Sequence, residues 1–124
     1  MESSILNLFR HAENIQTFDA GETIFTEGST GREMYVVLEG SVDIRVGNNT
    51  LDVTGPGGVF GEMALIDSST RSATAIAKDD CTLAIVDERQ FLRMAEQTTL
   101  FTLNVMQILA SRLRRMNSML ELDP

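Results

Sequence analysis

Short apolar segments alternate with glycine-bearing turns between residues 18 and 86 of the chain. Residues 42–46 read Val-Asp-Ile-Arg-Val, which is the alternation of a strand with one buried face. The Gly-Asn-Asn sequence at residues 47–49 then predicts the turn of a hairpin into a strand at 51–53. Many short strands of this kind bury their apolar faces by forming a sandwich or a barrel. The pattern therefore predicts a mainly β domain.

Two further strands are predicted after a cluster of chain-breaking residues. The Gly-Pro-Gly-Gly sequence at residues 55–58 ends the hairpin region. Apolar runs at residues 72–77 and 82–86 then have the length and composition of strands. They complete the predicted β region.

Helices are predicted on both sides of the strands. Ser4 is suited to cap a first helix, whose apolar stripe comprises Ile5, Leu6, Leu8 and Phe9. Asp87 is suited to cap a second helix, which ends near residues 97–99, and a long last helix then reaches about Leu120. The predicted fold class is therefore mainly β with flanking helices, the last of them long.

The last helix carries an apolar stripe with steps of three and four residues. Its members are Leu103, Met106, Leu109, Leu113, Met116 and Leu120. Such heptad-like spacing is typical of a helix that pairs with another helix. Packing on the chain's own barrel explains part of the stripe, and the spacing towards the C-terminus favours a homodimer through this helix.

Length and composition exclude several classes of protein. The 124 residues suffice for one domain, and 43% of them are hydrophobic, as in an ordinary globular protein. No apolar run approaches the roughly 20 residues of a membrane helix. The N-terminus lacks a signal-peptide pattern, and the single Cys81 excludes an internal disulfide. We therefore expect a cytoplasmic protein with no membrane partner.

The charge of the chain argues against nucleic acid as a partner of this chain alone. Its net charge is −8, whereas nucleic-acid surfaces are basic. The strongest basic cluster comprises Arg112, Arg114 and Arg115, near the end of the last helix. Cations at that end complement the helix dipole, which explains the cluster without DNA.

Residues 60–74 combine the groups that recognise an anion and a hydroxyl. Gly61 and Glu62 stand at the start of a predicted short helix, and Arg71 follows a small loop. A helix N-terminus presents unpaired N–H groups and partial positive charge, and a guanidinium adds a bidentate pair to phosphate oxygens. Glu62 repels phosphate but accepts hydrogen bonds from a sugar hydroxyl. Taken singly, Glu62 and Arg71 are ordinary surface charges, worth about 0–1 kcal/mol as a pair.

This segment resembles the phosphate-binding cassette of cyclic nucleotide-binding domains. The resemblance extends upstream through Gly21-Glu22, Glu27-Gly28, Tyr35-Val36-Val37 and Gly40-Ser41-Val42, and it covers most of the chain. Thr70 departs from the family pattern, in which proline very often precedes the arginine. The loop that includes Ser68 and Ser69 is therefore expected to be more mobile than usual.

The resemblance also implies a domain organisation. Residues 1–124 form a single domain whose residues 18–86 are a β jelly roll, also called a double-stranded β-helix. The phosphate-binding cassette comprises residues 60–74 of it. Residues 1–17 are the N-terminal helical segment, and residues 87–120 are the C-terminal helices.

The resemblance implies roles for individual residues. Glu62 accepts the ribose 2′-hydroxyl, and Arg71 binds the cyclic phosphate. The ligand-binding set is completed by cassette residues that allow close backbone approach: Gly61, Met63, Ala64, Ser72 and Ala73. Apolar walls of the base pocket are expected from Val59, Phe60, Met34 and Val36. Arg112 falls where some bacterial ion-channel members place an arginine against the purine, so it is expected in the lid.

The resemblance further implies a ligand and a mechanism. A threonine after the arginine tends to accompany cGMP preference in this family, whereas Ser72 is compatible with cAMP. We therefore expect cAMP rather than cGMP. The nucleotide draws the cassette inward, the last helix folds over the base, and the position of that helix reports occupancy to an effector whose identity the sequence does not give.

Three alternatives remain open from the sequence. A cupin-type metal enzyme needs several histidines, but the chain has only His11, outside the predicted barrel, so we expect no metal, cofactor or catalysis. The second alternative is a larger transcription regulator or channel. Such regulators carry a helix-turn-helix after the long helix, and because this chain shows none, it would be the sensor fragment of such a protein. The third is a structural or dimerisation module of the same fold that has lost its ligand.

Overall fold

The computed structural model describes residues 6, 9, 12–66, 70–97 and 99–121. The strands in these ranges are β1 (Ile15–Phe18), β2 (Thr23–Phe25), β3 (Glu33–Glu39), β4 (Val42–Val46), β5 (Asn49–Thr54), β6 (Val59–Phe60), β7 (Thr74–Ala77) and β8 (Cys81–Asp87). The helices are α2 (Met63–Ile66), α3 (Glu88–Gln97) and α4 (Thr99–Glu121). Within these ranges, no helix is both long enough and apolar enough to cross a membrane.

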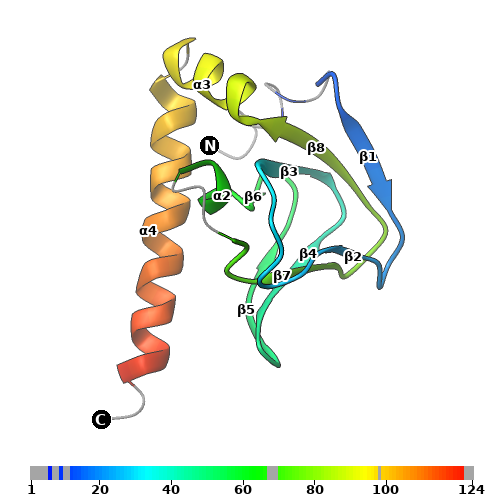
Figure 1. The fold of residues 1–124 in the computed structure, drawn as a ribbon, viewed down its shortest axis with the longest axis vertical. Coiled ribbons are helices and arrows are strands. Elements are labelled where there is room, and N and C mark those ends of the chain that lie inside the picture. Colours follow the sequence, from blue (N-terminus) through cyan, green and yellow to red (C-terminus); the bar gives the residue numbers. More distant parts are fainter. Residues whose placement is uncertain (1–5, 7–8, 10–11, 67–69, 98, 122–124) are drawn as a thin grey trace.

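The described strands form two four-stranded antiparallel sheets. One has the order β1-β8-β3-β6 and the other the order β2-β7-β4-β5, so the strands of each sheet come from distant parts of the chain. Helix α4 runs along one side of the strands, with α3 across its N-terminal end (Figure 1). The predicted fold class, mainly β with flanking helices and a long last helix, is confirmed.

Two hydrophobic cores share the β1-β8-β3-β6 sheet. The inner core lies between the two sheets and comprises Tyr35, Val37, Val42, Ile44, Phe60, Ala73, Ala75, Ala77, Cys81, Leu83 and Ile85. The outer core lies between the same sheet and the helices, and comprises Phe9, Met34, Val36, Val59, Ala84, Val86 and Val105. Strand β8 is therefore apolar almost throughout, because both of its faces are buried.

The predicted apolar stripe of α4 is partly packed against the barrel and partly exposed. Leu109 packs against the outer core with Ile108, so this part of the stripe binds the helix to its own barrel. Four other members of the stripe remain exposed: Leu103, Met106, Leu113 and Met116. The side chain of the last member, Leu120, lies outside those described.

Local helix signals in the sequence agree with the structure. Asp87 accepts a hydrogen bond from the backbone N–H of Gln90 at 2.8 Å and so caps α3, as predicted. The predicted break falls between α3 and α4. Leu6 and Phe9 have helical backbone, and Phe9 is buried, but most of the predicted first helix lies outside the described residues.

Three predicted strand boundaries are wrong. Strand β1 begins at Ile15, inside the predicted helical segment, because Ile15–Phe18 pairs with distant β8. Strand β7 begins at Thr74 rather than residue 72, because the backbone of Arg71 bonds instead to Gly28 and Ser29. Asn49, predicted in a turn, is the first residue of β5 and pairs with β4.

Gly40, in the turn between β3 and β4, provides a test of the packing of the inner core. Its φ is +84°, and a Cβ there would lie 2.7 Å from the Cβ of Cys81. Gly47 also has a positive φ of +61°, but nothing lies within 4 Å of its Cβ position. We expect Gly47→Ala to lower the free energy of unfolding by about 1–2 kcal/mol through backbone strain alone. Gly40→Ala adds a steric cost of about 1–3 kcal/mol.

Urea denaturation of the two variants and the parent protein measures this difference. Equal destabilisation by the two substitutions would show that the turn at Gly40 relaxes to accept a methyl group.

Candidate functional site

The backbone around Arg71 is fixed between α2 and β7. Its N–H donates to the carbonyl of Ser29, and its carbonyl accepts from the N–H of Gly28, both at 2.8 Å. Its guanidinium points into the barrel, where Nη1 donates to the carbonyl of Gly61 at 2.9 Å. Arg71 is only 5% exposed, which excludes the ordinary reading of a solvated surface arginine.

Two aromatic rings contact the guanidinium of Arg71. Its Cζ lies 4.2 Å from the ring centre of Phe25 and 5.8 Å from that of Tyr35. The rings of Tyr35 and Phe60 stack with centroids 5.0 Å apart. Cation–π contacts of this kind hold a cation without consuming its hydrogen-bond donors. Phe25 and this role of Tyr35 were not predicted from the sequence, because no local pattern indicates them.

Gly61 allows this close approach. Its φ is +77°, and a Cβ there would lie 3.0 Å from Nη1 of Arg71 and 3.2 Å from the ring of Tyr35. A side chain at this position would therefore displace the guanidinium as well as strain the backbone. The predicted need for a glycine before the acid has this physical basis.

Glu62 is a buried carboxylate at the start of α2. It is 1% exposed, and its Oε1 accepts a hydrogen bond from Nη1 of Arg112 at 2.5 Å. Its Oε2 is buried and has no hydrogen-bond partner among the residues that the structure describes. Oε1 of the carboxylate thus has a hydrogen-bond donor, and Oε2 has none among the described residues.

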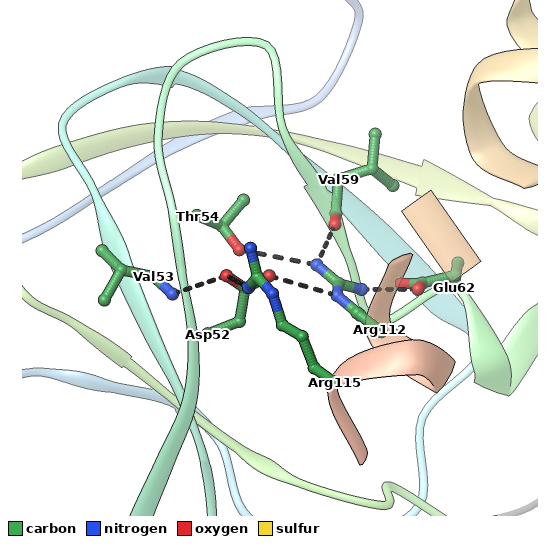
Figure 2. Close-up of polar contacts among 7 residues, drawn as sticks. All are labelled: Asp52, Val53, Thr54, Val59, Glu62, Arg112 and Arg115. Atoms are coloured by element: carbon green, nitrogen blue, oxygen red, sulfur yellow. Dashed lines mark hydrogen bonds and ion pairs between the residues drawn. The ribbon is translucent and has the colours of Figure 1, made fainter. Parts of the chain in front are cut away.

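Arg112 reaches this carboxylate from α4 and crosses to β5 (Figure 2). Its Nη2 donates to the carbonyl of Val59 at 2.5 Å and lies 3.5 Å from Oγ1 of Thr54. Its Nε lies 3.5 Å from Oδ2 of Asp52, and Asp52 also pairs with Arg115. From its position in the sequence, Arg112 is expected against a base. In the structure its guanidinium lies against Glu62.

Two buried polar atoms of opposite character remain without partners in this cassette. Nε of Arg71 is a donor, Oε2 of Glu62 is an acceptor, and neither has a hydrogen-bond partner within the described part of the chain. Leaving such a group unsatisfied costs about 1–3 kcal/mol, and more for a charged group. The arrangement suits a molecule that offers an anionic oxygen to Arg71 and a hydroxyl to Glu62.

The other predicted cassette residues surround these two. Met63 is exposed and begins α2, and Ala64 follows it in the helix. Ser72 is exposed, and Ala73 is buried in the inner core. The loop expected to be mobile falls at residues 67–69, which lie outside the described residues.

All four predicted walls of a base pocket are core residues in this structure. Met34, Val36 and Val59 are at most 1% exposed and belong to the outer core under the helices. Phe60 is also buried, but it faces the inner core beside Tyr35. The reason is the alternation of β3, which sends Met34 and Val36 away from the side that Tyr35 occupies.

The described residues hold neither a group suited to a metal nor an exposed thiol. No group of three or more His, Cys, Asp or Glu side chains among them is placed to hold a metal. Burial raises the pKa of the Cys81 thiol, and the neighbouring Asp80 adds to this, so the thiol is a poor nucleophile. His11 lies outside the described residues.

Comparison with known proteins matches most of this chain to one family. The family model described as "Cyclic nucleotide-binding domain" matches residues 15–98. The cyclic AMP receptor protein of Thermus thermophilus is 36% identical over 111 residues, which are 86% of this chain. The regulatory subunit of the cAMP-dependent protein kinase of Eremothecium gossypii is 38% identical over 74 residues, or 60% of this chain.

A solved structure supports the same likeness. The crystal structure of the Thermus thermophilus catabolite activator protein superposes with a TM-score of 0.80 at 31% identity, covering 96% of this chain and 58% of that chain. The alignments span 50% of the receptor protein and 16% of the kinase regulatory subunit. This chain thus corresponds to a part of each of these relatives.

Tyr35 serves as a built-in reporter of Arg71, since the chain has one tyrosine and no tryptophan. Burial raises the pKa of the Tyr35 phenol, while the Arg71 guanidinium opposes the rise and Glu33 adds to it. We expect the phenolate absorbance to appear with a midpoint above the ordinary value of about 10. In Arg71→Met the midpoint rises further, because the cation that favours the phenolate is lost.

The raised pKa of Tyr35 also predicts that the stability of the protein depends on pH. Because the folded state favours the neutral phenol, the contribution of Tyr35 to the free energy of unfolding is complete at neutral pH and is lost as the pH rises through its raised pKa.

Arg89→Met, at an exposed position on α3, serves as the control for the phenolate titration and leaves its midpoint unchanged. A midpoint that falls in Arg71→Met would contradict the placement of Arg71 beside Tyr35.

Proposed function

Because this chain belongs to the cyclic nucleotide-binding domain family, we propose that it binds a cyclic nucleotide and acts as a regulatory sensor without catalysis of its own. The observation that carries the proposal is the pair of unpartnered buried atoms, Oε2 of Glu62 and Nε of Arg71. A ribose hydroxyl donates to the first, and a cyclic phosphate oxygen accepts from the second. One ligand of this class satisfies both.

The proposed ligand is cAMP rather than cGMP. Two relatives are described by name as a cyclic AMP receptor protein and a cAMP-dependent kinase subunit, which supports cAMP. Ser72 is exposed at the edge of the cassette, and it lacks the methyl group of the threonine that accompanies cGMP preference in this family. No further cofactor is part of the proposal.

The proposed output is movement of α4. Asn104, on the face of α4 that packs against the barrel, is 3% exposed, and its amide nitrogen and oxygen have no partners among the described residues. Such burial costs about 1–3 kcal/mol and weakens the docking of the helix. A ligand that contacts Glu62, the partner of Arg112, then shifts the helix by an amount set by its differential affinity. Coupling of about 1–3 kcal/mol is typical.

The same helix is the proposed dimer interface. Leu103, Met106, Leu113 and Met116 are between 45% and 61% exposed and lie along one side of α4. Such a stripe suits pairing with α4 of a second copy. A module that dimerises without binding a nucleotide is the alternative that this stripe favours. The cytoplasmic location, the effector and membership of a larger regulator or channel belong to the same proposal.

Nucleotide affinity tests the proposed function. We expect calorimetric titration of the nucleotide-free, refolded protein to give micromolar or tighter binding of cAMP and weaker binding of cGMP. Arg71→Ala removes one partner of a buried charged pair, a loss of about 2–5 kcal/mol, so the affinity falls by at least about thirtyfold. Circular dichroism checks that the fold survives.

Arg89→Ala, on exposed α3, is the matched control and leaves the affinity unchanged. Absence of binding by a correctly folded parent protein would overturn the sensor proposal and favour the dimerisation module.

The dimer is tested by mass in solution. We expect sedimentation velocity to show a dimer for the parent protein and a monomer for Leu113→Glu, because a carboxylate in the centre of an apolar interface is left without a partner. Gln107→Glu introduces the same charge at an exposed position on α4 outside the stripe and leaves the dimer intact. A parent protein that is already monomeric at high concentration would exclude this interface.

A further inference from the structure

The two oxygens of the Glu62 carboxylate have different surroundings. Oε1 receives the Nη1 donor of Arg112 at 2.5 Å, whereas Oε2 is buried with no partner among the described residues. A glutamate carboxylate rotates in a broad, two-fold energy well when nothing holds it. The contact with Arg112 removes that freedom, and it leaves Oε2 as the oxygen available to another donor.

The guanidinium of Arg112 is itself held from three sides. Nη2 donates to the carbonyl of Val59 at 2.5 Å, and Nε lies 3.5 Å from Asp52 on β5. Arg115, one turn further along α4, also pairs with Asp52. The side chains of Arg112 and Asp52 are 14% and 18% exposed, so this pair is largely shielded from water, whereas the side chain of Arg115 is 52% exposed.

The charges of this chain of contacts balance. Glu62 and Asp52 supply two carboxylates, and Arg112 and Arg115 supply two guanidinium groups. A buried carboxylate without a cation is costly, and it would repel a phosphate that binds at the neighbouring Arg71. Arg112 therefore compensates the charge of Glu62 from the side of the helix, so this task does not fall to Arg71, whose Nη2 lies 3.7 Å from Oε2 of the exposed Glu33 side chain.

We propose that Arg112, anchored by Asp52, is a positioning residue that orients Glu62 for the ribose 2′-hydroxyl, so that discrimination of ribose from 2′-deoxyribose requires α4 to be docked. The inference rests on the proposed function. It gives Arg112 a task different from stacking on a base, since the group of the ligand that depends on Arg112 is the hydroxyl. The 2′-hydroxyl is then the part of the nucleotide that is coupled to α4.

A comparison of two nucleotides separates these roles. The affinities of cAMP and 2′-deoxy-cAMP are measured by calorimetry for the parent protein, Arg112→Gln, Asp52→Asn, Glu62→Gln and the control Arg114→Gln, whose side chain is exposed on the same helix. The parent protein prefers cAMP by at least about tenfold, as expected for a hydrogen bond to a charged acceptor. Arg114→Gln keeps this preference.

In Arg112→Gln we expect the affinity for cAMP to fall by about tenfold and that for 2′-deoxy-cAMP to change by less than about twofold. Asp52→Asn retains both Arg112 and Glu62 and gives a smaller loss of about threefold, again confined to cAMP. When Arg112→Gln is added to the Glu62→Gln variant, the ratio of the affinities for cAMP and 2′-deoxy-cAMP does not change further. Asp52→Asn decides the question if Arg112→Gln does not fold.

Equal losses for the two nucleotides in Arg112→Gln would overturn the inference and assign Arg112 to the base or the lid. An unchanged preference in both Arg112→Gln and Asp52→Asn would overturn it as well. Binding of neither nucleotide by the folded parent protein would overturn the proposed function, and this inference with it.

Discussion

The antiparallel pairing of β3 with β8 supports both cores, and the candidate site depends on its register. Successive residues of β3 point to opposite faces of the sheet. Tyr35 therefore lies in the inner core near the guanidinium of Arg71, while Met34 and Val36 lie in the outer core under the helices. A slip of one residue would exchange the two sets. Arg71 would lose its contact with Tyr35, and α4 would meet Tyr35 and Val37 in place of Met34 and Val36.

Two arginines contact Gly61 and Glu62 from different layers of the molecule. Arg71 contacts the carbonyl of Gly61 from inside the barrel, and Arg112 contacts the carboxylate of Glu62 from α4. A buried ion pair such as Glu62–Arg112 is often no more stable than apolar residues of similar volume. The stability of the fold therefore gives little reason for this pair, whereas recognition of a ligand gives a direct one.

Helix α4 has different properties on its two sides. The side towards the barrel carries Val105, which belongs to the outer core, but also the unsatisfied amide of Asn104 and the guanidinium of Arg112. The exposed side carries Leu103, Met106, Leu113 and Met116. A helix whose docking includes polar groups depends on what those groups contact, and this suits an element that changes position with occupancy of the site.

Several features follow from residues that are close together in the chain. The alternation at residues 42–46 predicts a strand that the structure contains, and Asp87 caps the helix that follows it because a cap acts within one turn. Gly61 and Glu62 directly precede α2, the short helix predicted to follow them. Local periodicity, capping and the chemistry of a short segment were enough for these features.

The sequence by itself determined the fold class and the presence of a carboxylate, Glu62, and an arginine, Arg71, in one short segment. Only the tertiary structure decided that Phe25 contacts Arg71, that Met34 and Val36 belong to the outer core, and that Arg112 contacts Glu62. Glu62 and Arg112 are separated by 50 positions, and Asp52 and Arg112 by 60. Contacts at such separations depend on how the sheets and α4 pack, and no local period of the chain encodes that packing.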